Sequence, residues 1–148
     1  MNMKIKYKYS TFVFVGCHSH AASTLLYEQI LVVGGQNRDI LNSAELYDPS
    51  TYMRTTTGSM NTIRRGHSAI ILRDGKVLVA GGYNGGYLQS AEWYNSSTGT
   101  WKTTGDMNHA RFLHTASILV NGQVLVTGGS SDSSSYLNSA ELYDPNTG

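Results

Sequence analysis

HSAIILRDGKVLVAGGYNGGYLQSAEWYNSSTGTWKTTGDM, residues 67–107, decides the fold because the chain on either side repeats it. His20, His67 and His114 are separated by 67 − 20 = 47 and 114 − 67 = 47 residues. The same interval relates three glycine pairs that start at positions 34, 81 and 128, and Ser-Ala-Glu recurs from positions 43, 90 and 139. A fixed period of about 20–50 residues indicates a repeat architecture.

Short apolar and β-branched runs within the central repeat predict one antiparallel meander. The predicted strands are residues 67–72, 76–80, 89–94 and 100–104. Asp74-Gly75 lies between the first two, and Asp-Gly between apolar runs predicts a hairpin turn whose two central residues both have φ > 0. The third copy has Asn121-Gly122 at this place, whereas the first copy lacks such a dipeptide, so we expect a different turn there. No helical periodicity is present.

The glycine pair is followed by a spaced set of large residues that carries a family resemblance. In the central repeat these residues are Gly81, Gly82, Tyr94, Trp101, Met107 and Arg111. This succession of residues resembles the kelch repeat, and the surrounding sequence is most similar to the kelch repeats of the galactose-oxidase-type propeller superfamily. This resemblance implies four strands per blade and a β-propeller, in which 4–8 blades typically form a ring.

The predicted fold is therefore all-β: a kelch-type β-propeller segment of about three four-stranded antiparallel blades, forming an incomplete ring. The repeats are expected at about residues 17–63, 64–110 and 111–148, the last ending before its tryptophan strand. The first repeat departs from the pattern at Arg54, which stands where Trp101 is expected (101 − 47 = 54), and Tyr52 or Met53 is expected to fill that gap. We expect a fragment, or a piece that self-associates to complete a ring.

Residues 1–16 support two interpretations. Lysines alternate with apolar residues over positions 4–9, which is typical of an edge strand. A basic start, a short apolar run and small residues at Gly16 and Cys17 also fit a weak secretory leader. As a further alternative, a strand over residues 4–14 would complete the third blade.

Composition excludes several classes of function. Charged residues make up 14% of the chain and the net charge is +1, so we expect no nucleic-acid partner. No apolar run approaches the roughly 20 residues of a membrane-spanning helix. The single cysteine excludes an internal disulfide framework. Neither observation decides between a cytoplasmic and a secreted location.

Candidate catalytic and metal-binding residues are also lacking. The three histidines that recur once per repeat are expected to be structural, because a residue that recurs once in every blade is required by the structure of the blade itself. Glu45, Glu92 and Glu141 recur in the same way, and we expect each to accept a backbone hydrogen bond or to face solvent. The copper site implied by a galactose-oxidase resemblance needs a Tyr-His pair and a cross-linked cysteine that no residues here match. We therefore predict no catalytic residue, no metal and no cofactor.

The loops after the glycine pairs differ between the copies, and repeat proteins often bind partners through such variable loops. The candidate binding residues lie in these loops and in the inter-blade linkers: Arg38, Arg64, Tyr83, Asn84, Tyr87, Arg111, Asp132 and Tyr136. The resemblance implies that Arg64 and Arg111 stand at a position that is usually structural in kelch proteins, although arginines of these loops can also line the binding face. The predicted function is a non-catalytic module that binds a protein or peptide. The alternatives are an extracellular carbohydrate-binding or galactose-oxidase-like fragment, and a fragment without independent function.

Overall fold

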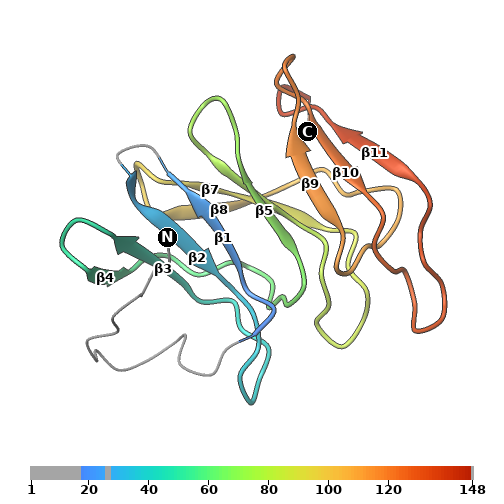
Figure 1. Cartoon of the computed structure of the whole chain (residues 1–148), viewed down its shortest axis with the longest axis horizontal. Coiled ribbons are helices and arrows are strands. Elements are labelled where there is room, and N and C mark those ends of the chain that lie inside the picture. The colour runs from blue at the N-terminus through green and yellow to red at the C-terminus, as the bar shows by residue number, and fades with distance from the viewer. Residues whose placement is uncertain (1–17, 26–27, 148) are drawn as a thin grey trace, which may run out of the picture.

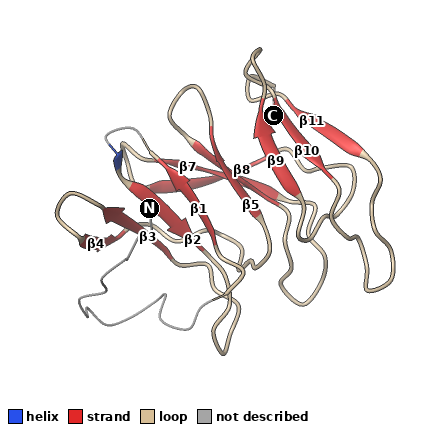
Figure 2. Ribbon diagram, viewed as in Figure 1, coloured by secondary structure: helices blue, strands red, loops and turns tan. Residues whose placement is uncertain are grey.

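The computed structural model describes residues 18–25 and 28–147. Within these ranges the only helical residue is Glu28, and all other regular structure is strand (Figure 2). The predicted N-terminal strand or leader, residues 1–16, lies outside the described residues, as does the strand over residues 4–14 proposed to complete the third blade. The strands are β1 (Ala21–Thr24), β2 (Ile30–Val33), β3 (Ala44–Asp48), β4 (Met53–Thr56), β5 (Ser68–Ile71), β6 (Val77–Ala80), β7 (Ala91–Asn95), β8 (Thr100–Thr104), β9 (Thr115–Ile118), β10 (Val124–Thr127) and β11 (Ala140–Tyr143).

Each repeat forms one antiparallel sheet whose strands follow chain order. The sheets are β1-β2-β3-β4, β5-β6-β7-β8 and the three-stranded β9-β10-β11. They stand side by side in a row, with the first strands β1, β5 and β9 adjacent (Figure 1). The prediction of an all-β chain with one antiparallel sheet per repeat is confirmed, and among the described residues the third sheet has three strands.

The Asp-Gly hairpin is correct in place but not in conformation. Gly75 has φ +82°, whereas Asp74 is not among the residues with positive φ. The amide of Gly75 donates to Leu72 O at 3.0 Å, and Leu72 N donates to Lys76 O at 2.7 Å. This is a turn of type I followed by a left-handed glycine, so only one residue needs positive φ. The prediction that both central residues have φ > 0 was wrong.

The first copy turns differently, as its sequence indicates. Leu25 N donates to Gln29 O at 2.6 Å, and Glu28 takes the left-handed conformation with φ +65° in place of a glycine.

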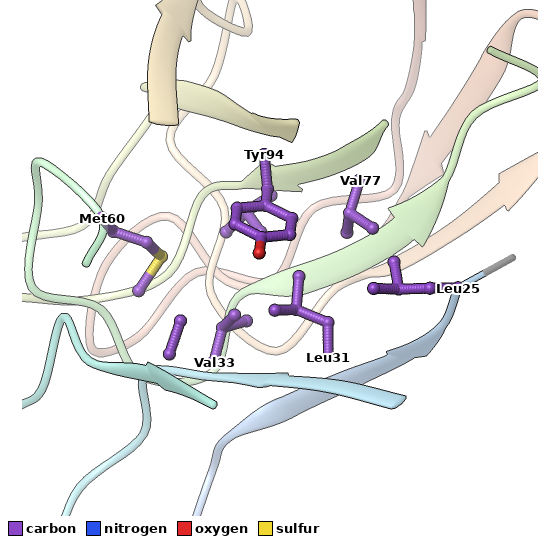
Figure 3. Close-up of a cluster of buried hydrophobic side chains, with 8 residues drawn as sticks. Leu25, Leu31, Val33, Met60, Val77 and Tyr94 are labelled. Carbon is purple, nitrogen blue, oxygen red and sulfur yellow. The ribbon is translucent and has the colours of Figure 1, made fainter. Parts of the chain in front are cut away.

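Two hydrophobic clusters lie between the three sheets, one at each interface. Leu31, Val33 and Met60 of the first repeat pack against Val77 and Tyr94 of the second (Figure 3). Leu78, Ala80 and Ala91 point to the other side of the second sheet and pack against Val124 and Val126 of the third. Adjacent residues of a strand face opposite sides of its sheet. All four residues of β6 are buried because a neighbouring sheet covers each side.

Trp101 joins the first interface, and its counterpart in the first repeat does not. Its indole Nε1 donates to Gly58 O at 2.6 Å, and its ring centroid lies 5.1 Å from that of Tyr94. Arg54 pairs with Tyr47 as Trp101 pairs with Tyr94. Tyr52 and Met53 are 75% and 64% exposed, so the prediction that one of them replaces the tryptophan was wrong.

The first glycine of each of the first two pairs lies where a side chain would strike the next repeat. Gly81 has φ +65°, and a Cβ there would lie 2.5 Å from Arg111 O and 2.8 Å from His114 Cε1. Gly34 has equivalent neighbours, Arg64 O at 2.6 Å and His67 Cε1 at 2.7 Å. In the third repeat Gly128 has φ +67°, but the nearest atom to a Cβ is Leu137 O at 3.9 Å.

We expect Gly81→Ala to lower the free energy of unfolding more than Gly128→Ala. Both changes place an L side chain at nearly the same positive φ, which costs about 1–2 kcal/mol. Only Gly81→Ala also pushes a methyl group into the next repeat, which adds about 1–3 kcal/mol. Chemical denaturation of the two variants measures the difference, and equal losses would contradict the packing described.

Candidate functional site

The topology brings the variable loops and the linkers to one edge of the sheets. In an antiparallel meander the second-to-third-strand loop and the segment leaving the fourth strand end at the same edge. Isolated bridges tie the two kinds of segment together: Arg65 pairs with Tyr83, and Phe112 pairs with Ser130. We call this end of the sheets, where the variable loops and the linkers meet, the loop edge. All the predicted binding residues lie on it.

Arg64 is a buried bridge between the first two repeats. Its backbone carbonyl accepts a hydrogen bond from Gly35 N at 2.8 Å. Its guanidinium enters the second sheet, where Nη1 donates to Gly81 O at 2.9 Å and to Ser90 O at 2.8 Å. Nη2 donates to Ser90 Oγ and to Glu92 Oε1, both at 3.0 Å. The side chains of Arg64 and Glu92 are both fully buried.

Arg111 repeats this arrangement between the second and third repeats. Its carbonyl accepts from Gly82 N at 2.7 Å, and its guanidinium binds Gly128 O, Ser139 O, Ser139 Oγ and the carboxylate of Glu141. Arg111 is fully buried. Since neither guanidinium reaches solvent, Arg64 and Arg111 are removed from the set of candidate ligand-binding residues.

Glu92 and Glu141 accept backbone hydrogen bonds, as one of the two sequence-based expectations has it, whereas Glu45 is buried and its Oε2 has no partner among the described residues. Glu92 Oε2 accepts from Asn61 N at 2.7 Å and from Asn61 Nδ2 at 2.8 Å, and Oε1 accepts from Thr62 N at 3.1 Å. Glu141 accepts the same bonds from Asn108 and His109. Burial raises the pKa of Glu141, but the hydrogen bonds from Asn108 and Arg111 outweigh it, and the net pKa is lowered.

Sequence analysis did not foresee the Arg–Glu pairing. The sequence pattern that indicates this pairing is the recurrence of both residues in successive repeats, at separations of 92 − 64 = 28 and 141 − 111 = 30. Buried charges in proteins are paired and hydrogen-bonded.

His67 and His114 pack over Gly34 and Gly81 and are neutral. Burial lowers the pKa of His67 to about 3, and the charge of Arg64 adds to that shift. Burial likewise lowers the pKa of His114 to about 4, together with the charge of Arg111. His114 Nε2 also pairs with Ser68 Oγ of the preceding sheet at 2.8 Å.

Four side chains from two linkers and one loop form an aromatic cluster at the loop edge. The ring centroid of Tyr83 lies 5.4 Å from that of Tyr87 and 6.0 Å from that of Phe112. The Arg65 guanidinium carbon lies 4.9 Å from the Tyr83 centroid and 5.2 Å from the Phe112 centroid. Phe112 also covers Gly66, where a Cβ would lie 2.2 Å from its ring. The cluster leaves Tyr83 and Tyr87 half-buried.

The third repeat has an open pocket at this edge, lined by Phe112, Leu113, Gly129, Ser130, Tyr136 and Leu137. Tyr136 is 89% exposed and Leu113 is 65% exposed. Leu113 has φ +54°, a conformation that is uncommon for a residue with a side chain. The equivalent residue of the second repeat is Gly66 (113 − 47 = 66), with φ +61°. Strained, exposed residues of this kind gather at functional sites.

The remaining predicted residues are exposed or shape their own loops. Arg38 is exposed in the loop of the first repeat. Asp132 Oδ1 accepts from Ser134 N at 2.8 Å and from Ser135 N at 2.6 Å, and it thereby holds the longer loop of the third repeat. Asn84 Oδ1 accepts from Gly86 N at 3.4 Å. Arg65, Phe112 and Leu113 were missed, although the replacement of Gly66 by Leu113 is visible in the sequence.

Two kinds of site do not occur in the described residues. Across 18–25 and 28–147, no group of three or more His, Cys, Asp or Glu side chains could hold a metal ion. The same part of the chain contains no helix long and apolar enough to cross a bilayer.

Tandem antiparallel sheets of chain-order strands, packed face to face and joined at one edge, define a β-propeller-type repeat protein. The family model described as Kelch motif matches residues 17–61, 64–108 and 111–148. The chain therefore belongs to the kelch-repeat family. A search of curated proteins returns no match.

The two buried histidines predict a loss of stability in mild acid. Both have a folded pKa below the unfolded value of about 6.5, so the unfolded state binds more protons as the pH falls below that value. The contribution of the two histidines to the free energy of unfolding is fully present above about pH 6.5. At pH 5 the free energy of unfolding is lower by about 1–2 kcal/mol for each histidine.

Chemical denaturation between pH 7 and pH 5 should therefore show a shallower pH dependence for His67→Asn/His114→Asn than for the wild type. The exposed His18→Gln variant should keep the wild-type dependence. Burial raises the pKa of Glu45, an effect of opposite sign that all three proteins share. Equal slopes in the double variant and the wild type would contradict the neutral, buried state.

Leu113→Gly should leave the free energy of unfolding unchanged or raise it by up to about 1 kcal/mol, because glycine adopts φ +54° without strain. Leu119→Gly, a half-buried leucine without positive φ, is the comparison and should destabilise. A clear loss of stability in Leu113→Gly would show that its side chain packs within the fold.

Proposed function

We propose that the chain is a non-catalytic binding module that takes a protein or peptide segment at the loop edge of the third repeat. The observation that carries this proposal is Leu113, a large apolar side chain that is 65% exposed at positive φ where the preceding repeat has glycine. A residue that is both exposed and strained contributes little to folding, so its side chain points to a role in recognition. Kelch repeats commonly form protein-interaction modules, which supports the same function.

The preceding repeat indicates what the pocket would accept. There Phe112 packs on Gly66, Tyr83 and Tyr87. The equivalent positions of the third repeat are Leu113, Ser130 and Tyr136, which line the open pocket. We therefore expect the partner to insert an aromatic or large aliphatic side chain between Leu113 and Tyr136. Tyrosine is among the residues enriched at protein interfaces.

Selection of displayed random 12-residue peptides against the full chain tests this function. Enriched sequences should share one aromatic or large aliphatic position, because burying such a side chain supplies the affinity. Leu113→Gly and Tyr136→Ala should each weaken a selected peptide about tenfold or more. Tyr52→Ser removes a tyrosine that is 75% exposed at the other edge of the sheets and should leave binding unchanged.

Peptides that bind all three variants alike would contradict the proposed site. The carbohydrate alternative has its own signature on a glycan array, namely a sugar whose binding depends on Tyr136 but not on Leu113.

Self-association would use a different surface, the outer face of the third sheet. Leu142, which pairs with Leu125, is 57% exposed there, and Gly128 meets no neighbouring repeat. We expect light scattering to give a dimer, of twice the 16.1 kDa chain mass, that Leu142→Asp converts to monomer. A wild-type monomer at all concentrations would contradict self-association and leave the peptide proposal unaffected.

A further inference from the structure

The first sheet contains the same arrangement of acceptors that holds a buried arginine in the second and third sheets. In the second sheet these acceptors are Gly81 O, Ser90 O, Ser90 Oγ and the Glu92 carboxylate. Gly34, Ser43 and Glu45 are their counterparts (81 − 47 = 34, 90 − 47 = 43, 92 − 47 = 45). The backbone frame is also shared, since Gly34 N donates to Ser43 O at 3.0 Å and Gly81 N donates to Ser90 O at 3.1 Å.

In the first sheet two side-chain acceptor atoms are buried without a partner among the residues that the structure describes. Glu45 is 6% exposed, and neither its Oε2 nor Ser43 Oγ forms a hydrogen bond with any of those residues. Burial raises the pKa of Glu45, and the charge of Arg54 on β4 only partly opposes that shift. An unsatisfied buried carboxylate is costly, and buried polar groups in proteins are hydrogen-bonded almost without exception.

The sequence at the register of Glu45 differs from the sequences that fill the other two sites. Glu92 and Glu141 are each held by an Asn-Xaa-Xaa-Arg segment, Asn61 to Arg64 and Asn108 to Arg111. One interval earlier, these positions are Phe14 and Cys17 (61 − 47 = 14, 64 − 47 = 17). The sequence thus has neither the asparagine nor the arginine at the register of Glu45.

We propose that Gly34, Ser43 and Glu45 form a binding site for an arginine side chain, presented by an Asn-Xaa-Xaa-Arg segment of a partner protein. The asparagine amide and side chain would donate to one oxygen of Glu45. The guanidinium would donate to the other oxygen, to Ser43 Oγ and to the carbonyls of Gly34 and Ser43. Lysine cannot replace arginine, because only the planar guanidinium serves carboxylate, hydroxyl and carbonyl acceptors together.

A partner protein is a better source of this arginine than a second copy of the chain. Both Asn-Xaa-Xaa-Arg segments of the chain are already used within it, and withdrawing Arg64 or Arg111 would leave Glu92 or Glu141 buried without its counter-charge. Breaking such a pair is strongly destabilising. The site belongs to the first sheet and does not depend on the pocket of Leu113 and Tyr136.

The chain's own linker supplies the probe. A fluorescein-labelled peptide of residues 59–66, Ser-Met-Asn-Thr-Ile-Arg-Arg-Gly, carries the segment that fills the second sheet. Fluorescence anisotropy with the full-length protein should show saturable binding with a dissociation constant below about 1 mM. A peptide with Arg64→Lys should bind at least tenfold more weakly, whereas Arg65→Lys, which keeps the same charge at the next position, should bind as the parent does.

Variants of the protein test the other side of the contact. Glu45→Gln and Ser43→Ala should each weaken the peptide about tenfold or more. Asp39→Asn removes an exposed carboxylate from the same repeat and should have no effect. The peptide should also raise the melting temperature of the wild type but not that of Glu45→Gln, because a ligand stabilises only the folded state that binds it.

Several outcomes would overturn the proposal. They are the absence of binding at millimolar peptide, equal binding of the two lysine peptides, and undiminished binding to Glu45→Gln. Should Glu45→Gln prove unfolded by circular dichroism, Ser43→Ala decides, since it removes one hydroxyl and keeps the buried carboxylate.

Discussion

The buried arginine of each linker is the interaction on which the rest of the structure depends. Its carbonyl is bonded to the glycine pair of one sheet, while its guanidinium binds the glutamate and two carbonyls of the next. Burial lowers the pKa of Arg64, against the hydrogen bond and charge of Glu92. A buried guanidinium is tolerable only when carboxylate and carbonyl oxygens meet it at several points. The relative position of adjacent sheets is therefore set by polar geometry as well as by the apolar clusters.

This constraint makes each repeat incomplete by itself. Gly81 is required by the carbonyl and imidazole of the next linker, yet the equivalent Gly128 faces no such neighbour. Both oxygens of Glu92 accept hydrogen bonds, whereas the equivalent Glu45 has one oxygen without a partner in the described part of the chain. The same residue type thus has a different energetic role in each repeat, and the difference lies in the neighbour. Repeat proteins in general derive much of their stability from such nearest-neighbour interfaces.

The fold could be predicted largely from the sequence because its signals are local and repeated. Strand β8 has the predicted bounds, and the glycine pairs, histidines and turns lie where the period puts them. The errors concern tertiary packing. The turn at Asp74 uses a conformation that the Asp-Gly dipeptide does not distinguish, and Tyr52 and Met53 are exposed because no packing demand holds them inward. Of the candidate site, Tyr136 could be named from loop variation. The burial of Arg64 could not, because it requires knowing that Glu92 lies across from it.

Comparison between repeats separates structural from functional residues more sharply than residue type does. Arginine and tyrosine both resemble binding residues in isolation, but Arg111 has the same internal partners as Arg64 and is explained by the fold alone. Leu113 departs from its counterpart Gly66 and retains positive φ, at a conformational cost that the fold does not require. Glu45 is retained at the position of Glu92, but the sequence has Cys17 where the arginine that would pair with Glu45 is expected. Leu113 is a substitution that strains the backbone, and Glu45 is a retained residue whose partner has been replaced. Both residues are therefore explained by interactions outside their own repeat.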